Sequence, residues 1–423
     1  MTQQTLSFMQ TLGRNTKTAS RVLAHVSTAE KNQALEKIAC QIELEQAAIL
    51  AANVQDLADA KQTGMSEALQ DRLMLNEKRM QGIVADLRNV IHLPDPVGEV
   101  IETQDMPNGL KMRKQRVPMG VLGVIYESRP NVTVDVAGLA LKSGNCVILR
   151  GGKETLRSNT AFVSAIQRGL AGSSVPADAI QLVTDSDRTL VLELLQMDQY
   201  VNMIIPRGGA GLHDFCRKNS RIPVITGGIG ICHLFMDASA DLDKSIEVVR
   251  NAKIQRPSVC NSLDTVLVHR SVAAEFLPKL VKRLTDDGVT FRADAKALAL
   301  LEGFESVMPA AEADFDTEWL SLVLGLKVVD SLQEAIDHIA QHSTHHSDGI
   351  LTNDDYNAAE FLEQVDSAAV YVNASTRFTD GSQMGLGAEI AISTQRMHAR
   401  GPMGLRELTT YKWVVQGDYH VRP

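Results

Sequence analysis

The sequence predicts an α/β protein whose parallel sheets carry helices on both faces. Between residues 121 and 232, short runs rich in β-branched residues alternate with helical segments. Strands joined through helices run parallel, and such sheets are covered on both sides. The runs are GVLGVIYE, NCVILRGG, AIQLVT, VNMIIPRGG and IPVITGG. A second alternating stretch, from about 233 to 385, includes LKVVD, DGILT and AAVYVNAS. Ligands of such sheets are expected at the carboxyl ends of the strands.

Helices are expected before these two stretches, and extended strands beside them. Residues 20–92 are predicted to be helical, because apolar residues recur at intervals of three and four. Asn108-Gly109 lies between two strand-like arms, which predicts a β-hairpin. Cations on the second arm form either a solvated strand face or a subunit contact. They are Lys111, Arg113, Lys114 and Arg116. The late segment LTTYKWVV is predicted to add a strand at a sheet edge.

The composition is that of a globular protein. The chain has 423 residues, of which 44% are hydrophobic, and its net charge is −9. This charge gives it no general attraction to nucleic acid or anionic membrane. Aromatic residues make up 4%, too few for base-stacking platforms. No apolar run reaches the roughly 18 residues of a membrane helix, and no secretory segment is recognisable. Two or three domains and a cytoplasmic location are expected.

The five cysteines predict neither a disulfide framework nor a zinc site, because their number is odd and their spacing is not paired. Cys260 is the candidate for chemistry. Pro257 disfavours helix just before it, so the thiol is expected on a helix-to-strand loop among polar neighbours. It is either a nucleophile for an acyl or carbonyl carbon or a packed core thiol. The other four are expected in the core: Cys40, Cys146, Cys216 and Cys232.

Two glycine-rich segments follow strand-like runs and are candidates for holding anionic groups. In IIPRGGAGL, Gly208 and Gly209 let backbone amides approach a phosphate at the start of a helix. In NCVILRGGKE, Arg150 and Lys153 stand at the end of a strand, where cations can hold a ribose and a 2′-phosphate. The usual dinucleotide fingerprint Gly-x-Gly-x-x-Gly is absent. Ordinary tight turns and a solvated loop are the alternative interpretations.

Seven motifs resemble those of the gamma-glutamyl phosphate reductase family, a branch of the aldehyde dehydrogenase superfamily. They are GVIYESRPNVT, SGNCVILRGGKE, PVITGGIG, QRPSVCN, EWLSLVLGLKVVD, VYVNASTRFTDG and HARGPMGLRELTTYKW. The resemblance covers nearly the whole chain. It implies an aldehyde-dehydrogenase-like fold with two Rossmann-like α/β domains and a small β oligomerisation element. The NADPH-binding domain would comprise residues 1–102 and 118–232, the catalytic domain 233–385, and the oligomerisation element 103–117 and 386–423.

The resemblance implies a step of proline biosynthesis. The Cys260 thiolate would attack the acyl carbon of L-glutamyl 5-phosphate and expel phosphate. A hydride from NADPH would reduce the thioester, and collapse of the thiohemiacetal would release L-glutamate 5-semialdehyde. In the superfamily the oxyanion is held by the backbone N–H of the nucleophile and by an asparagine, which corresponds to Asn131 here. The alternative interpretation of Asn131 is a turn residue after Pro130.

The resemblance also assigns residues to the cofactor. Arg150 falls where related enzymes have a cofactor-binding lysine. Lys153 falls where many NAD-preferring relatives have a glutamate for the ribose hydroxyls. An ammonium at that position attracts a 2′-phosphate and favours NADPH. Glu154 follows directly, so the alignment leaves either residue at this position. Glu318 matches the glutamate that holds the nicotinamide ribose.

One departure from the superfamily concerns water. Hydrolytic aldehyde dehydrogenases have a glutamate directly before a Gly-Gly pair, and this base activates the water that cleaves the thioester. Here Ile225-Thr226 precede Gly227-Gly228, so the carboxylate is missing. Its absence favours reduction of an acyl phosphate over hydrolysis. A hydrolytic NAD(P)-dependent aldehyde dehydrogenase is the alternative function. A non-enzymatic scaffold is a third interpretation, disfavoured because Cys260, Asn131 and Glu318 occur together.

Two arginines are candidates for the anionic groups of the substrate, because guanidinium groups form forked contacts with carboxylate and phosphate. They are Arg256 and Arg377, and each could equally pair with a structural acid. No metal is expected, since His338 and His342 have helical spacing but lack a third ligand. The resemblance further implies a homodimer or homotetramer and a transient contact with glutamate 5-kinase. No nucleic-acid or membrane partner is expected.

Overall fold

The computed structural model describes residues 7–227 and 229–422. The chain divides into two compact units. Unit 1 comprises Met1–Thr226, Gly385–Ala391 and Met403–Pro423, and unit 2 comprises Gly227–Met384 and Ile392–Pro402. The chain therefore passes from one unit to the other four times, after Thr226, Met384, Ala391 and Pro402.

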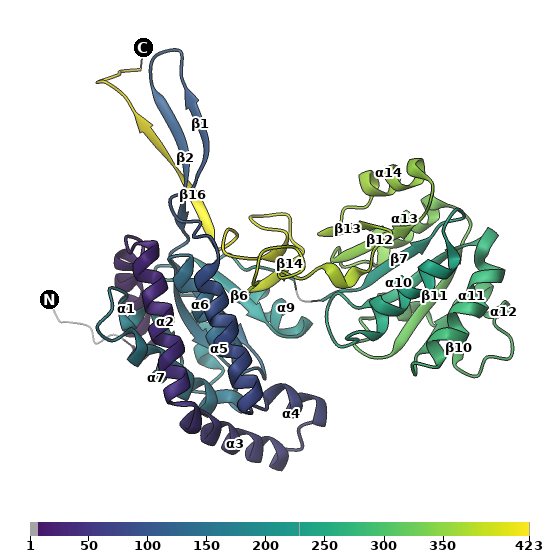
Figure 1. The fold of residues 1–423 in the computed structure, drawn as a ribbon, viewed down its shortest axis with the longest axis horizontal. Coiled ribbons are helices and arrows are strands. Elements are labelled where there is room, and N and C mark those ends of the chain that lie inside the picture. Colours follow the sequence, from purple (N-terminus) through teal and green to yellow (C-terminus); the bar gives the residue numbers. More distant parts are fainter. Residues whose placement is uncertain (1–6, 228, 423) are drawn as a thin grey trace. The chain divides into compact units, whose positions relative to one another are not determined.

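The first helices of unit 1 confirm the helical prediction for residues 20–92, with turns between them. Ser7 and Ser27 begin the first two helices with capping boxes, in which the serine side chain and a Gln or Glu three residues later bond each other's backbone. Buried apolar side chains lie along α1, α2 and α5. Figure 1 shows these helices beside the other elements of the unit. The helices are α1 (Phe8–Leu23), α2 (Thr28–Leu44), α3 (Gln46–Gln62), α4 (Glu67–Leu73) and α5 (Glu77–His92).

Unit 1 contains a parallel sheet with the strand order β5-β4-β3-β6. The expected fifth strand IPVITGG is reduced to an isolated bridge between Val224 and Ile204, because the neighbouring Pro223 has no N–H to extend a ladder. The strands are β3 (Val121–Tyr126), β4 (Cys146–Arg150), β5 (Ile180–Leu182) and β6 (Met203–Arg207). The helices are α6 (Asn131–Lys142), α7 (Leu156–Leu170), α8 (Thr189–Leu195) and α9 (Ala210–Asn219), with short 3₁₀ turns at Lys153–Thr155 and Ala177–Ala179.

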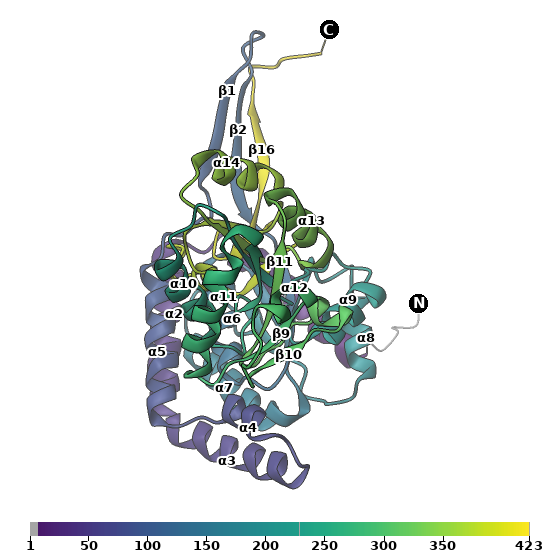
Figure 2. The same ribbon diagram turned by 90° about the vertical axis from the view of Figure 1, so that its right-hand side faces the viewer.

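A separate antiparallel sheet of unit 1 forms an arm that Figure 2 shows extending beyond the helices of its unit. The hairpin prediction is confirmed: Gly109 turns the chain with φ +91°, a conformation that glycine adopts without strain. The late segment adds a third strand beside the hairpin, as expected. The strands are β1 (Val100–Asp105), β2 (Lys111–Pro118) and β16 (Thr409–Gln416). On β2, the Lys114 ammonium lies 4.6 Å from the centre of the Trp413 ring.

Unit 2 contains a seven-stranded sheet in which every neighbouring pair is parallel. Successive residues of its central strands are buried on opposite faces, as the doubly covered sheet requires. Leu234 and Val266 pack in the cluster with α10 and α11, whereas Phe235 and Leu267 pack in the cluster with α13 and α14. The strand order is β10-β9-β11-β8-β7-β12-β13. The predicted α/β class is therefore confirmed.

Along the chain of unit 2, most strands of the sheet are followed by a helix. The strands are β7 (Cys232–Met236), β8 (Leu263–His269), β9 (Thr290–Ala293), β10 (Val307–Pro309), β11 (Val323–Val329), β12 (Ser347–Leu351) and β13 (Ala369–Val372). The helices are α10 (Leu242–Ile254), α11 (Arg270–Thr285), α12 (Ala295–Ala299), α13 (Leu332–His342) and α14 (Asp355–Gln364), with 3₁₀ turns at Glu312–Asp316 and Thr376–Phe378. The short pair β14 (Ala391–Ser393) and β15 (Gly401–Met403) contains two of the crossings between the units.

The cysteines depart from expectation at one position. Cys146, Cys216 and Cys232 are buried, as predicted, but Cys40 is exposed. Its thiol lies on the solvent side of α2 beside Glu36 and Arg88, one residue away from the buried stripe. Within the described ranges, all five cysteines are thiols, and no helix is long and apolar enough to cross a bilayer.

Gly169 shows how closely α7 packs on α2. A Cβ atom at Gly169 would lie 2.8 Å from Cα of Ile38, which is backbone and cannot turn aside. We expect Gly169→Ala to destabilise the protein by about 1–3 kcal/mol, because overpacking forces the two helices apart. Gly82→Ala in α5 is the matched control, since no atom lies within 4 Å of its Cβ position. Urea unfolding followed by circular dichroism measures both, and an equal effect of the two substitutions would contradict the prediction.

Candidate active site

Each of the two units contains candidate residues. In unit 2, Cys260 lies on the loop between α10 and β8, as predicted, and is half-buried. Its neighbour Asn261 fixes this loop to the segment after β13. The Asn261 amide donates to the Thr379 carbonyl (2.8 Å), and the Asn261 carbonyl accepts from the Thr376 hydroxyl (2.7 Å). Two hydrogen bonds of Asn261, one from its side chain and one to its main-chain carbonyl, therefore hold the loop next to Cys260.

The backbone of Gly230 lies directly against that of Cys260. A Cβ atom at Gly230 would be 1.5 Å from the carbonyl oxygen of Cys260, so only glycine fits. The Cys232 thiol, at the start of β7, donates to the same carbonyl oxygen at 3.3 Å. The segment at the start of β7 therefore packs directly against the main chain of the Cys260 loop. Sequence analysis missed Gly230, because one glycine in a run of several carries no local signal.

The structure brings Arg256, Arg377 and Cys260 together. Arg377 is half-buried in the 3₁₀ turn after β13, and its Nε donates to the Gln255 side chain at 2.9 Å. Burial lowers the pKa of Arg377, the charge of Arg256 lowers it further, and the Cys260 sulfur acts in the opposite direction. The Arg377 guanidinium therefore interacts with both the Cys260 thiol and the Arg256 charge. Cations beside a cysteine favour its thiolate form, which is the nucleophile.

Glu318 belongs to the same half of the site. Its carboxylate accepts from the Gly230 N–H at 2.9 Å, so it is fixed to the segment that touches Cys260. Burial raises the pKa of Glu318 to about 7. Glu318 precedes β11, Cys260 precedes β8 and Gly230 precedes β7. These three residues thus precede their strands, whereas ligands of parallel sheets are expected at the carboxyl ends.

In unit 1, Asn131 is the first residue of α6 and not a turn residue after Pro130. Its amide donates to the carboxylate of Asp135 at 2.9 Å, one helical turn further along. Burial raises the pKa of Asp135 to about 6. Asp135 was missed in the sequence, although its spacing of four from Asn131 is a signal for such a contact. The carboxylate fixes which end of the amide carries its N–H donors.

The residues near Lys153 separate into two roles. Glu154 accepts from both the N–H and the hydroxyl of Ser128 at 2.8 Å, and Ser128 has the unusual φ of 44°. The carboxylate is thus occupied in holding the loop before α6. Lys153 is exposed. Of the two neighbours, Lys153 is therefore the one presented to solvent and able to meet a charged ligand.

Arg150, at the end of β4, is buried and bonded to main chain. Its guanidinium donates to the carbonyls of Gly151 (2.7 Å) and Ser186 (3.0 Å), and burial lowers its pKa. It joins the loop after β4 to the loop after β5. Its Nε is buried without a hydrogen-bond partner. Such a group is suited to shaping a binding loop as well as to contacting a ligand.

Gly208 and Gly209 lie at the start of α9, with Gly209 as the N-cap. The Glu127 carboxylate faces this helix end and accepts from the Gly209 N–H at 3.3 Å. A Cβ atom at Gly208 would be 2.4 Å from the same carboxylate. Glu127 thus lies at the helix end where a phosphate was predicted. Backbone amides at a helix N-terminus favour anions, and in this structure the Glu127 carboxylate is the anion that faces them. Sequence analysis missed Glu127.

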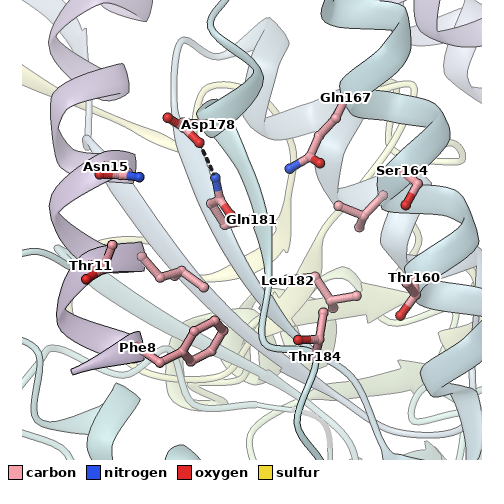
Figure 3. Close-up of a pocket in the computed structure, with 12 residues that line it drawn as sticks. Phe8, Thr11, Asn15, Thr160, Ser164, Gln167, Asp178, Gln181, Leu182 and Thr184 are labelled. Atoms are coloured by element: carbon pink, nitrogen blue, oxygen red, sulfur yellow. Dashed lines mark hydrogen bonds between the residues drawn. The ribbon is translucent and has the colours of Figure 1, made fainter.

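A hollow of about 320 Å³ lies elsewhere in unit 1, between α1, α7 and β5 (Figure 3). Amides, hydroxyls and apolar side chains line it, and Gln181 donates to Asp178 within it. None of the predicted site residues contributes to its wall. Across the described residues, no group of three or more His, Cys, Asp or Glu side chains is placed to hold a metal ion.

Comparison with known proteins identifies the family. The model of the aldehyde dehydrogenase family matches residues 8–294. A gamma-glutamyl phosphate reductase of Vibrio parahaemolyticus is 57% identical over 411 residues, which cover 97% of this chain and 99% of the relative. The crystal structure of gamma-glutamyl phosphate reductase from Thermotoga maritima is 48% identical with a TM-score of 0.96, and the match covers 99% of this chain and 100% of that one.

The chain therefore belongs to the aldehyde dehydrogenase family. Within that family, its identity and near-complete coverage put it among the gamma-glutamyl phosphate reductases. The family inferred from the seven motifs is confirmed. A more distant relative is the gamma-glutamyl phosphate reductase of Saccharomyces cerevisiae, whose structure is 30% identical with a TM-score of 0.55 and is matched over 99% of this chain and 100% of that one.

The contact between Gly230 and Cys260 predicts that Gly230→Ala disrupts the cysteine loop. Because the added methyl group would overlap the Cys260 carbonyl, the loop must move, and we expect the reactivity of this thiol to change about tenfold or more. Site-resolved alkylation with iodoacetamide, quantified by mass spectrometry, measures this. The exposed Cys40 in the same sample is an internal reference, and Gly82→Ala is the matched control. Unchanged Cys260 labelling would refute the contact.

Proposed function

We propose that this chain reduces L-glutamyl 5-phosphate to L-glutamate 5-semialdehyde with NADPH, releasing phosphate, through a thioester on Cys260. The observation that carries this proposal is the half-buried Cys260 thiol, on a loop that Gly230 contacts and with the Arg377 guanidinium interacting with its charge. The name shared by its close relatives supports the same reaction, a step of proline biosynthesis. Two cations beside one nucleophile suit an acyl phosphate, whose leaving group is an anion.

The chemistry of the chain's own residues begins with the thiolate. Cys260 Sγ forms a bond to the acyl carbon, and the bond from that carbon to the phosphate oxygen breaks, so phosphate leaves with its electron pair. Arg256 and Arg377 bind the anionic groups of the substrate and neutralise the departing charge. In unit 2, the Cys260 N–H is the proposed donor to the oxyanion of the tetrahedral intermediate. In unit 1, the Asn131 amide, which Asp135 orients, is the second donor that the family resemblance implies.

The family implies a nicotinamide cofactor, and the residues present fit one. NADPH, when bound, supplies the hydride that reduces the thioester. Lys153 binds the 2′-phosphate, Arg150 shapes the adjacent loop, and Gly208 and Gly209 offer the start of α9 to the pyrophosphate. Glu318 accepts from the hydroxyls of the nicotinamide ribose. The exposed ammonium of Lys153 supports NADPH over NADH.

Hydrolysis of the thioester is the competing reaction, and the sequence before Gly227 lacks the base for it. Ile225 and Thr226 carry no carboxylate to activate water, and Gly228 lies outside the described residues. An acyl-phosphate reductase gains from this absence, because water at the thioester would waste the intermediate as glutamate. A hydrolytic aldehyde dehydrogenase is the second candidate function. It would oxidise the aldehyde without phosphate, whereas the proposed reductase needs phosphate to run in the direction of aldehyde oxidation.

The family resemblance also supports a division of the chain into functional regions and a homo-oligomer. We assign cofactor binding to residues 1–102 and 118–232, catalysis to 233–385, and oligomerisation to 103–117 and 386–423. The arm supports the last assignment, because Tyr411, Trp413 and Val415 leave apolar surface exposed. A homodimer or homotetramer in the cytoplasm and a transient contact with glutamate 5-kinase complete the proposal.

Cys260→Ser is expected to abolish turnover and leave NADPH binding largely intact, because the serine hydroxyl is a far weaker nucleophile. The assay supplies glutamate 5-semialdehyde, NADP⁺ and phosphate and follows NADPH absorbance, while fluorescence titration measures cofactor binding. Wild-type signal should depend on phosphate. Equal signal without phosphate would favour the hydrolytic candidate, and undiminished turnover of the serine variant would remove the mechanism.

Lys153→Glu should raise the KM for NADPH far more than the KM for NADH. The substitution replaces an attractive charge with a repulsive one, and a charge-assisted hydrogen bond is worth about 1.5–3 kcal/mol, or roughly ten- to hundredfold in binding. Steady-state kinetics with both cofactors measures the ratio, and Lys153→Gln separates loss of attraction from added repulsion. An equal effect on the two cofactors would show that Lys153 does not contact the 2′-phosphate.

A further inference from the structure

A buried ion pair closes the base of the Cys260 loop in unit 2. Lys253 is in the last turn of α10, and Asp264 is the second residue of β8. Their side chains are 0% and 2% exposed, and the Lys253 Nζ lies 3.6 Å from Asp264 Oδ1. Burial lowers the pKa of Lys253 and raises the pKa of Asp264 to about 6. Neither residue contributes to the mechanism above.

Lys253 ties the two ends of the loop together. Its ammonium donates to the main-chain carbonyl of Leu263 at 2.8 Å, which joins the end of α10 to the start of β8. The Ser262 hydroxyl makes a weaker bond of 3.5 Å to the Ala252 carbonyl in the same place. The segment between these anchors carries both Arg256 and Cys260. Its span is therefore set by one side chain that reaches across its base.

Asp264 extends this link to the other parts of the half-site. One carboxylate oxygen accepts from the main-chain N–H of Trp319, the residue after Glu318, at 3.1 Å. The other accepts from the Cys232 N–H at 3.4 Å, two residues after Gly230. The Asp264 carboxylate is thus bonded both to the first residue of β7 and to the segment that contains Glu318. A single buried charge connects the nucleophile to the residue assigned to the nicotinamide ribose.

Stability alone is a weak explanation for such a pair. Taking two charges out of water is expensive, and well-packed apolar residues in place of a buried ion pair are often as stable or more so. What apolar residues cannot do is bond three main-chain groups from three segments at fixed distances. A displacement of about 1 Å in a reacting group can lower a rate by roughly 10²-fold.

We propose that Lys253 and Asp264 are positioning residues that hold Cys260 and Glu318 in register for the reaction. Lys253 sets the nucleophile loop, and Asp264 sets both this loop and the Glu318 segment. The inference rests on the proposed function, because it presumes that Cys260 reacts and that Glu318 meets the cofactor. It predicts different kinetic defects for the two residues.

The test compares Lys253→Met, Asp264→Asn and the double variant Lys253→Met/Asp264→Leu with wild type. Lys244→Met is the matched control, since Lys244 lies on the same helix, is 85% exposed and pairs with Asp241 at the surface. Each full-length protein is assayed with glutamate 5-semialdehyde, NADP⁺ and phosphate. The melting temperature and the alkylation rate of Cys260 relative to Cys40 are measured alongside.

Lys253→Met should lower kcat by roughly 10- to 100-fold and alter the alkylation rate of Cys260, with a KM for NADP⁺ within about threefold of wild type. Asp264→Asn should lower kcat and also raise the KM for NADP⁺ by more than about threefold, because an amide cannot accept from both N–H groups. The double variant should recover the melting temperature and keep the low kcat. Lys244→Met should match wild type.

Three results would overturn the inference. The first is a folded Lys253→Met or Asp264→Asn protein with wild-type kcat and Cys260 labelling. The second is a double variant that recovers kcat together with its melting temperature, which would make the pair purely structural. The third is failure of all three variants to fold. Failure of the proposed function is distinguishable, because the wild-type signal would then be independent of phosphate or Cys260→Ser would retain turnover, whatever the effect of Lys253→Met.

Discussion

The contact between the main chains of Gly230 and Cys260 is the constraint on which the rest of the half-site depends. No side chain fits between them, so the strand β7 and the nucleophile loop must approach at backbone distance. The Gly230 N–H then faces Glu318, and the Cys232 thiol reaches the Cys260 carbonyl. One close approach of two backbones thereby brings Cys260 and Glu318 to the same place.

The two units use opposite ends of their parallel sheets. In unit 1, Arg150 and Gly208 follow their strands, where helix N-termini point and anions are favoured. In unit 2, Cys260 and Glu318 precede theirs. The difference has a chemical reason. A phosphate-bearing cofactor gains from helix dipoles and backbone amides, whereas a covalent nucleophile needs a rigid loop and nearby cations, which a helix-to-strand connection supplies.

Charge inside unit 2 is arranged in two layers around Cys260. Arg377 interacts with the Cys260 thiol and with the charge of Arg256. Lys253 and Asp264 lie at the base of the loop and bond to main chain. In the proposed mechanism, Arg256 and Arg377 act on the reacting groups directly, and Lys253 and Asp264 act through the positions of the segments that they join. No histidine lies near Cys260 in the sequence to favour its thiolate form. Arginines can take this role, because they stay charged at every physiological pH.

The sequence by itself determined the α/β class, the hairpin at Gly109, the loop position of Cys260 and the family, because these follow from local periodicity, turn chemistry and motifs. It also singled out Arg377, although that residue is far from Cys260 along the chain. Tertiary structure alone decided the approach of Gly230 to Cys260, the contacts of the Asp264 carboxylate, and the reduction of one expected strand to a bridge. These contacts join residues distant in sequence or depend on which helix face is buried, and neither is encoded in a short segment.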